Sequence, residues 1–457
     1  MNRATLSPSD PQPFGGAHAV VVGGSITGLL AARVLSHHFA TVTVIERDHF
    51  PTGPEWRKGT PQARHVHVLL KQGERILDRY FPDLLADLRV AGADRVDMAG
   101  ETRWFHFGGW KARFDSGMDM SCQSRGFLEW KIRSHLERQH NVRILEGHDV
   151  TGFQRVGQRL VGVRISARGE DATDRELSAD LVVDASGRGT RTPQWLEQLG
   201  FTAPPVTEVG VDVGYASRFY RRPRRPPTDW KVLLIYPKPL GTRLGVIIPV
   251  EGDRWMVTLV GWFGDHPAAD EAGFSEFMQS LPVPDLYLAI RDAEPASPIA
   301  VHKFPSNLRR HYERVRTMPE GLIVIGDALC SFNPIYGQGM TTGSMAAVTL
   351  DEHLAAQRRR HGAGDLTGFS SRFQRQLARV IGSAWLLTTS EDLRSPQAQG
   401  RRPRWIGLLH WYTAKIHRLA WRDPFVGACF LRVMHLTEPA TALFHPAVIV
   451  RALTAAP

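Results

Sequence analysis

The chain has 457 residues, of which 42% are hydrophobic and 22% are charged, so it can hold two or three domains, or one elaborate α/β unit, around a real core. Its formal net charge of +10 raises the question of an acidic partner. Arginine is spread along the whole chain, however, and no nucleic-acid-binding signature accompanies it, so we expect no nucleic acid. The three cysteines are widely spaced, without a metal-ligand pattern or a disulfide framework, which favours a reducing cytoplasm.

No stretch approaches the length of a membrane-spanning helix. Residues 1–17 lack the apolar core of a secretory signal and predict a loose tail. The densest basic run, residues 221–225, is interrupted by Pro223 and followed by Pro226 and Pro227. This pattern favours a solvated, proline-stiffened loop over a polyanion site.

Residues 20–28, VVVGGSITG, predict a buried strand, a tight turn and the start of a helix. Gly23, Ser25 and Gly28 have the spacing of a dinucleotide-binding turn, with serine at the second glycine position. Small residues there let the backbone approach a pyrophosphate, and the helix directs free N–H groups and a positive dipole end at it. A second strand over residues 41–45 then ends at Glu46, where a carboxylate would accept hydrogen bonds from ribose hydroxyls.

The segment after Glu46 predicts a loop rich in proline and glycine, then a helix over residues 66–77. Arg64, His65 and His67 form a small polar cluster at its start. Two histidines two residues apart could ligate a metal on a strand, but no third ligand is recognisable, so we expect packing histidines and no metal.

The aromatic segment at residues 103–114 predicts two short strands around Gly108 and Gly109. Its large rings could line an apolar pocket or belong to the core: Trp104, Phe105, Phe107, Trp110 and Phe114. Ser124 then predicts the cap of a helix that runs to residue 136. Arg125 lies in its first turn, where it meets a phosphate or ribose if this helix adjoins the dinucleotide, and is a surface arginine otherwise.

The middle of the chain predicts mainly strands. A strand at 142–145, a three-part meander at 150–153, 160–165 and 175–177, and a buried strand at 181–183 precede the turn DASGRG. Residues 208–220 alternate between apolar and polar, which is typical of a half-buried antiparallel strand. Its expected partners, and a helical segment at 271–292, complete a second sheet domain, with partner strands at 231–236, 243–249 and 254–261.

A strand at 322–325 leads to Asp327, then to a loop with Pro334, Gly337 and Gly339 and into a long helix. Beyond about residue 362 the pattern is helical throughout, with three tryptophans interleaved with arginines in its last part. We expect a lid or packing domain there, with peripheral contact to a membrane surface as the less favoured alternative.

Three motifs, the turn at residues 23–28, the DASGRG turn and IGDA…NPIYGQGM at 325–340, together resemble the FAD-dependent monooxygenase superfamily with the aromatic-hydroxylase fold. The stretches ERDHFP…RKGTPQARHVHVLL and IPVEGDRWMVTLVGWFGD resemble the actinobacterial branch that includes polyether epoxidases. The resemblance implies FAD, with Glu46 at the adenosine ribose, Arg125 at the pyrophosphate or ribitol, and the backbone of Val150 at the adenine; Arg47 is a further candidate cofactor-binding residue.

At the flavin end, the resemblance implies Asp327 on the ribitol and the backbone of Gly337, Gly339 and Met340 against the pyrimidine side of the ring. A helix N-terminus there would stabilise the negative charge of reduced flavin, and Pro334 would supply an apolar wall.

The implied fold is α/β, with a Rossmann-like FAD-binding domain of the glutathione-reductase-like type, an inserted antiparallel substrate domain and a C-terminal helical region. We expect the FAD-binding domain at 15–92, 121–202 and 298–360, the substrate domain at 93–120 and 203–297, and the helical region at 361–457.

The implied activity is transfer of one oxygen atom from O₂, through a flavin C4a-hydroperoxide, to a bulky apolar substrate, by epoxidation or hydroxylation of a polyketide- or terpenoid-like intermediate. Arg64 and His67 are the candidate catalytic residues. Relatives reduced directly by NADPH carry Asp-Gly in the middle motif, whereas this chain has Ser186-Gly187-Arg188, so the electron source is NAD(P)H or a separate flavin reductase. A halogenase, a double-bond reductase and a non-catalytic flavin-binding sensor remain alternatives.

Overall fold

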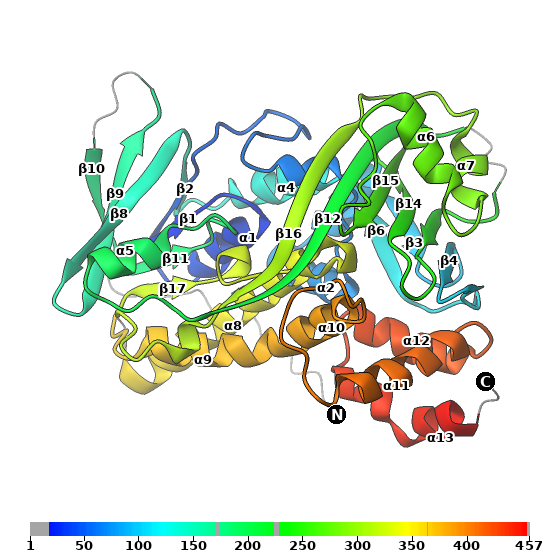
Figure 1. Cartoon of the computed structure of the whole chain (residues 1–457). Coiled ribbons are helices and arrows are strands. Elements are labelled where there is room, and N and C mark those ends of the chain that lie inside the picture. The colour runs from blue at the N-terminus through cyan, green and yellow to red at the C-terminus, as the bar shows by residue number, and fades with distance from the viewer. Residues whose placement is uncertain (1–17, 170–173, 224–227, 363, 455–457) are drawn as a thin grey trace.

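The computed structural model describes residues 18–169, 174–223, 228–362 and 364–454 (Figure 1). The expected tail at residues 1–17, and residues 224–227, which include the last two residues of the basic run and the two prolines after it, lie outside this part of the chain. The described residues confirm a mixed α/β fold with several sheets and a set of helices at the C-terminal end.

A parallel five-stranded sheet forms the centre of the nucleotide-binding part, and all five of its predicted strands are confirmed. These short, β-branched runs suit a sheet covered on both faces. Helix α1 packs on β1 and β2 and contacts α4 and α8. The strand order is β17 (Leu322–Val324), β11 (Leu181–Asp184), β1 (His18–Val22), β2 (Thr41–Ile45) and β7 (Val142–Leu145), with helices α1 (Ile26–Leu35), α4 (Arg125–Leu136) and α8 (Gln338–His361).

The predicted meander is confirmed as a three-stranded antiparallel sheet beside the central sheet (Figure 1). Each strand is longer than the predicted one, because residues that face the solvent also pair with the neighbouring strand. The elements here are β8 (His148–Val156), β9 (Arg159–Ala167), β10 (Asp174–Ser178) and the following helix α5 (Thr192–Gln198).

The second large sheet has eight strands and contains every strand predicted between residues 208 and 261. Its alternating strand buries Val209, Val211, Val213 and Tyr215 in one core. The order is β18 (Cys330–Ser331), β16 (Ala300–Arg310), β12 (Val206–Arg221), β15 (Arg254–Trp262), β14 (Arg243–Val250), β13 (Val232–Ile235), β4 (Thr102–His106) and β5 (Gly109–Trp110), beside a ribbon of β3 (Asp94–Asp97) and β6 (Asp119–Cys122).

Two predictions need correction, and one long strand was missed. The helix expected at 66–77 begins later, as α2 (Lys71–Tyr80), because the preceding segment is tied to the large sheet: Val66 N donates to Thr258 Oγ1 at 3.0 Å. The helix expected at 271–292 is two helices, α6 (Glu271–Gln279) and α7 (Asp285–Ile290), separated by a segment with two prolines. Strand β16 was not predicted.

The C-terminal region is helical, as predicted, and contacts both the central part and the large sheet (Figure 1). In the described part of the chain no helix is both long and apolar enough to cross a membrane. Its helices are α9 (Phe369–Val380), α10 (Gly382–Asp392), α11 (Ile406–Leu419), α12 (Pro424–Met434), η5 (Ala440–Phe444) and α13 (Pro446–Thr454); the remaining short helices are α3 (Leu84–Val90), η1 (Pro61–Arg64), η2 (Tyr312–Arg314), η3 (Gly326–Ala328) and η4 (Pro334–Tyr336).

Candidate functional site

A cavity of about 300 Å³ lies at the carboxyl ends of β1, β2, β11 and β17. Open parallel sheets bind ligands at this edge. The cavity is lined by every cofactor residue predicted from the sequence except Gly28: Gly23, Ser25, Glu46, Arg47, Arg125, Val150, Asp327, Pro334, Gly337, Gly339 and Met340. We call this space the dinucleotide cavity.

Close packing around the first turn explains its glycines. Gly23 has a φ of 103°, and a Cβ on it would lie 2.6 Å from the carbonyl oxygen of Ala185. A Cβ on Gly28 would lie 1.9 Å from the carbonyl oxygen of Gly23. Gly28 therefore acts below the cavity, where it lets α1 approach the turn.

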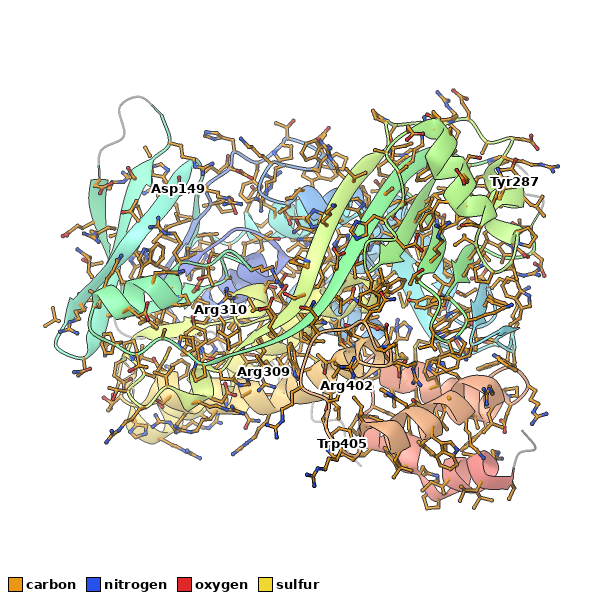
Figure 2. All side chains as sticks on the ribbon, in the orientation of Figure 1. Asp149, Tyr287, Arg309, Arg310, Arg402 and Trp405 are labelled. Carbon is orange, nitrogen blue, oxygen red and sulfur yellow. The ribbon has the colours of Figure 1, made fainter. Side chains whose placement is uncertain are left out.

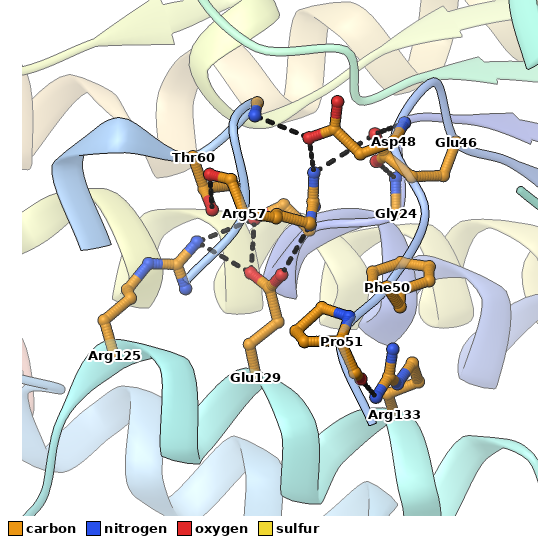
Figure 3. Close-up of polar contacts among 12 residues, drawn as sticks. Gly24, Glu46, Asp48, Phe50, Pro51, Arg57, Thr60, Arg125, Glu129 and Arg133 are labelled. Carbon is orange, nitrogen blue, oxygen red and sulfur yellow. Dashed lines mark hydrogen bonds and ion pairs between the residues drawn. The ribbon is translucent and has the colours of Figure 1, made fainter. Parts of the chain in front are cut away.

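Arg57 is the centre of a buried ion network that the sequence analysis missed (Figure 3). Its Nη1 lies 3.1 Å from Glu46 Oε1 and 3.2 Å from Asp48 Oδ2, and its Nε lies 3.2 Å from Glu129 Oε1. These carboxylates outweigh burial and raise the pKa of Arg57, although burial is the largest single influence and acts to lower it. Glu46 also accepts a 2.8 Å hydrogen bond from Gly24 N, which ties the network to the glycine turn.

Arg125 extends this network along the cavity toward Met340 in the first turn of α8. Its Nη2 donates to Ser25 Oγ at 2.6 Å and lies 3.1 Å from Glu129 Oε2. Burial lowers the pKa of Arg125, while the charge of Glu129 opposes that shift. Ser124 caps α4 by accepting a bond from Phe127 N, as predicted, so the guanidinium is held at a fixed helix start.

These groups fit a dinucleotide. Arg57 lines the cavity, and its buried Nη2 has no hydrogen-bond partner among the described residues, so one cationic donor remains for a ligand oxygen. Gly23 leaves the backbone of the turn accessible beside it. Arg57 and Glu129 carry no local sequence signal, because they come together only when the loop after β2 folds onto α4.

At the other end of the cavity, Asp327 follows β17 and Gly337 begins α8 with a φ of 65°. Asp327 faces the cavity, where it is accessible, yet the surrounding protein still desolvates it and raises its pKa; the charges of Arg125 and Arg188 act in the opposite direction. No described residue donates a hydrogen bond to this carboxylate. It is therefore free to accept one from a ligand hydroxyl.

The two candidate catalytic residues lie in different places. His67 lines the dinucleotide cavity, with Nδ1 2.9 Å from the carbonyl oxygen of His65. Burial, reinforced by the charge of Arg125, lowers the pKa of His67 to about 4, so the ring is neutral at pH 7 and Nδ1 donates to the carbonyl. Arg64 does not line this cavity; its guanidinium lies 3.3 Å from the ring centre of Trp56.

His65 packs against the large sheet, with Nδ1 2.7 Å from Ser217 Oγ. Burial lowers its pKa to about 3. No group of three or more histidine, cysteine, aspartate or glutamate side chains among the described residues could hold a metal ion. The bond between His65 and Ser217 fixes the extended segment that contains His67 against the large sheet.

An inner chamber of about 120 Å³ adjoins the dinucleotide cavity, with which it shares Val68, Pro334 and Gly337. Its other wall is the large sheet, and its lining is mostly apolar, including Met120, Leu234, Leu244, Val246, Ile248 and Val260. This chamber therefore lies beside the end of the dinucleotide cavity that Pro334 and Gly337 line.

An outer chamber of about 200 Å³ adjoins the inner chamber, with which it shares Trp104, Tyr236, Ile335 and Tyr336. Helices α10, α11 and α12 form its far wall. The aromatic segment is divided between pocket and core: Trp104 and Phe107 line the outer chamber, and Phe105 and Trp110 pack in the core under the large sheet, whereas Phe114 packs against the C-terminal helices.

A buried carboxylate lies between the chambers and the C-terminal helices. Asp392 accepts hydrogen bonds from Asn307 Nδ2 at 2.6 Å, Asn333 Nδ2 at 2.9 Å and the Tyr336 hydroxyl at 2.9 Å. Burial raises the pKa of Asp392 to about 6, although these three bonds favour its charged form. The network joins α10 to the loop that begins at Asn333.

The middle motif forms a structural turn at the edge of the dinucleotide cavity. Asp184 accepts bonds from Ser186, Thr190 and Thr192, and Gly187 has a φ of 86°. The guanidinium of Arg188 donates to Ser306 on β16 at 2.6 and 2.7 Å. Arg188 therefore links the central sheet to the large sheet.

A family model that describes an FAD binding domain matches residues 17–378. This chain belongs to that family. FAD is its cofactor, in agreement with the fit of the dinucleotide cavity, and the fold is that of flavin-dependent monooxygenases.

Two relatives and one solved structure illustrate the similarity. Protein Rv3254 of Mycobacterium tuberculosis is 33% identical over 432 residues, which cover 92% of this chain and 90% of the relative. Kynurenine 3-monooxygenase of Salinispora arenicola is 27% identical over 373 residues, which cover 74% and 72%. The flavin-dependent brominase Bmp2 is similar in structure, with a TM-score of 0.66 at 16% identity over 95% of this chain and 98% of that one.

Proposed function

We propose that this protein is a monooxygenase that uses FAD to insert one oxygen atom from O₂ into a bulky, largely apolar organic substrate. The observation that carries the proposal is that three cavities adjoin: the dinucleotide cavity and the inner chamber share Val68, Pro334 and Gly337 in their linings, and the inner chamber adjoins the outer one. A relative named as a kynurenine 3-monooxygenase supports the same reaction class.

The bound flavin supplies the oxidant, and the chain supplies binding, orientation and a dry environment. The apolar wall formed by Leu244, Val246 and Val260 excludes water and positions an apolar carbon frame beside the ring. The free N–H groups at the start of α8 stabilise negative charge on the reduced cofactor.

His67 Nε2 is the proton-accepting atom in this proposal. Its Nδ1 donates to the carbonyl of His65, which fixes the tautomer and leaves the Nε2 lone pair available at the cavity wall. Arg64 does not line the cavity, so we assign it no contact with the substrate.

Within this class we propose epoxidation or hydroxylation of a polyketide- or terpenoid-like intermediate, as in the polyether-type branch that the sequence resembles. The reductant is NAD(P)H or a separate flavin reductase. The cofactor residues named from the sequence are proposed to hold FAD in the roles given there, with Arg57 and Glu129 added.

The test is turnover of the holoprotein with isotopically labelled O₂ and a panel of apolar alkenes and phenols. NADPH is supplied alone or with a flavin reductase, and parallel reactions contain bromide or chloride. We expect a product that carries one labelled oxygen atom. A halogenated product would favour a halogenase, and a saturated product formed without O₂ consumption would favour a double-bond reductase; either result would contradict the proposal.

A further inference from the structure

The C-terminal helices expose an unusual concentration of large apolar side chains. Eight of the fifteen such exposed side chains among the described residues lie between residues 386 and 453. Six of these lie on α11, at the residue that precedes it, and on the adjoining η5 and α13, and we call them the apolar patch: Trp405, Leu408, Trp411, Phe444, Val450 and Leu453.

The patch is one surface because its helices pack together. Trp405, Leu408 and Trp411 lie three residues apart along α11, on its outward side, and are 51%, 69% and 48% exposed. The ring of Phe444 stacks on Tyr412 of α11 at 5.0 Å, and Lys415 Nζ donates to the carbonyl of Ala452 on α13. Figure 2 shows Trp405 at the outer edge of the molecule, away from the sheets.

The charged side chains of the segment that contains α11 have one sign. Residues 394–422 contain seven arginines and lysines and neither aspartate nor glutamate, so this short segment supplies much of the net charge of +10. Arg401, Arg404 and Arg418 are exposed and have no ion-pair partner among the described residues. Aromatic and aliphatic side chains flanked by unpaired arginines are the composition of a helix that lies in the interface of an anionic bilayer.

The inward side of the same helix lines the outer chamber. Leu409, Tyr412, Thr413 and Ile416 contribute to that wall. Phe444 belongs both to the apolar patch and to the chamber lining, and exposed Leu386 lines the chamber beside it. The rim of the outer chamber is therefore continuous with the patch.

We propose that the apolar patch docks this protein onto the surface of an anionic lipid bilayer, with the rim of the outer chamber against the lipid. A second copy of the chain is a poorer occupant, because a symmetric contact would place two basic segments against each other. The proposal concerns binding alone, so its test does not depend on the oxygenase activity.

The test is co-sedimentation of the FAD-loaded protein with vesicles of phosphatidylcholine alone or of an equal mixture of phosphatidylcholine and phosphatidylglycerol. We expect binding to the mixture and much weaker binding to phosphatidylcholine. The variant R401Q/R404Q/R418Q should lose about a hundredfold in partitioning to the mixture, since each arginine near an anionic surface contributes about fivefold. The control R358Q/R359Q/R360Q, which removes three arginines at the end of α8, should bind as the native protein does.

The apolar contribution is tested with W405S/L408S/W411S, which should reduce binding by about tenfold or more. Its control, V90S/V156S/L288S, removes three exposed apolar side chains elsewhere and should have no effect. The visible spectrum of bound FAD reports that each variant is folded.

Three results would overturn the proposal. They are equal binding to both vesicle types, unchanged binding of the folded patch variants, and a lipid-free dimer that W405S/L408S/W411S converts to a monomer. The last result would assign the patch to a second copy of this chain.

Discussion

Arg57 holds the buried charges of the dinucleotide cavity together. It approaches Glu46, Asp48 and Glu129 within 3.2 Å, and no motif residue joins as many elements of the site. A buried carboxylate that loses its cation is left desolvated without compensation. The residue therefore serves the stability of the site as well as cofactor binding.

Substitution of Arg57 by methionine should lower the free energy of unfolding by about 3–5 kcal/mol and weaken FAD binding, because Glu46, Asp48 and Glu129 each lose a cationic partner, although Glu129 keeps Arg125. Urea unfolding of the FAD-free protein and FAD titration measure the two effects. The control is Arg221→Met, since Arg221 pairs with Glu294 at the surface, outside this network, and should contribute about 1 kcal/mol or less. A loss as small as that of the control would refute the role given to Arg57.

Asp392 should make stability depend on pH. Burial raises its folded pKa to about 6, above that of the unfolded chain, so its folded form holds the proton more tightly. The contribution of protonated Asp392 to the free energy of unfolding is complete below about pH 4. It is lost as the pH rises through about 6, which lowers that free energy by about 3 kcal/mol. The difference in unfolding free energy between the native protein and Asp392→Asn should shrink by that amount from pH 4 to pH 7; a constant difference would contradict this account.

At the scale of elements, the short distance between α1 and the glycine turn is the tightest constraint on the site. Gly28→Ala places a Cβ 1.9 Å from a backbone oxygen, so α1 must move away from the turn. We expect a loss of about 3 kcal/mol in unfolding free energy and weaker FAD binding. Gly407→Ala, in the first turn of α11 with nothing within 4 Å, should be neutral or stabilising. If urea unfolding gave the same change in unfolding free energy for both substitutions, close packing of α1 on the glycine turn would not explain the role of Gly28.

Sequence patterns predict an element well when its pattern of apolar residues matches the burial of those residues in the fold. The strands of the parallel sheet are buried β-branched runs, and β12 alternates as a half-buried strand does. Strand β16 was missed because it contains Pro305, which argues against a strand unless its partners are known. The start of α2 was misplaced because Val66 and His65 bond to the large sheet, a contact that periodicity does not encode.

The same division holds for the site. Motif residues such as Glu46 and Asp327 could be named from the sequence, since each follows a strand at a fixed place. Arg57, Glu129 and Asp392 could not, because each acquires its environment from a segment far away in the chain. The shape of the chambers was also beyond the sequence, as it depends on side chains from two sheets and the C-terminal helices.

In the whole molecule, the cavity that fits FAD adjoins apolar chambers enclosed by the large sheet and the C-terminal helices. This arrangement gives a reactive cofactor a dry volume and gives an apolar molecule a place beside it. The basic, apolar surface of α11 lies on the outside of the same enclosure.

The most direct measurement is substrate-stimulated O₂ consumption by the holoprotein and by Val246→Trp, with labelled O₂ and the substrate found in the panel. Val246 lines the inner chamber, so the larger ring should fill it, abolish stimulation and labelled product, and leave FAD content unchanged. Val156→Trp, at an exposed site, should behave as the native protein. Undiminished formation of labelled product by FAD-loaded Val246→Trp would contradict the claim that the substrate reacts in this chamber.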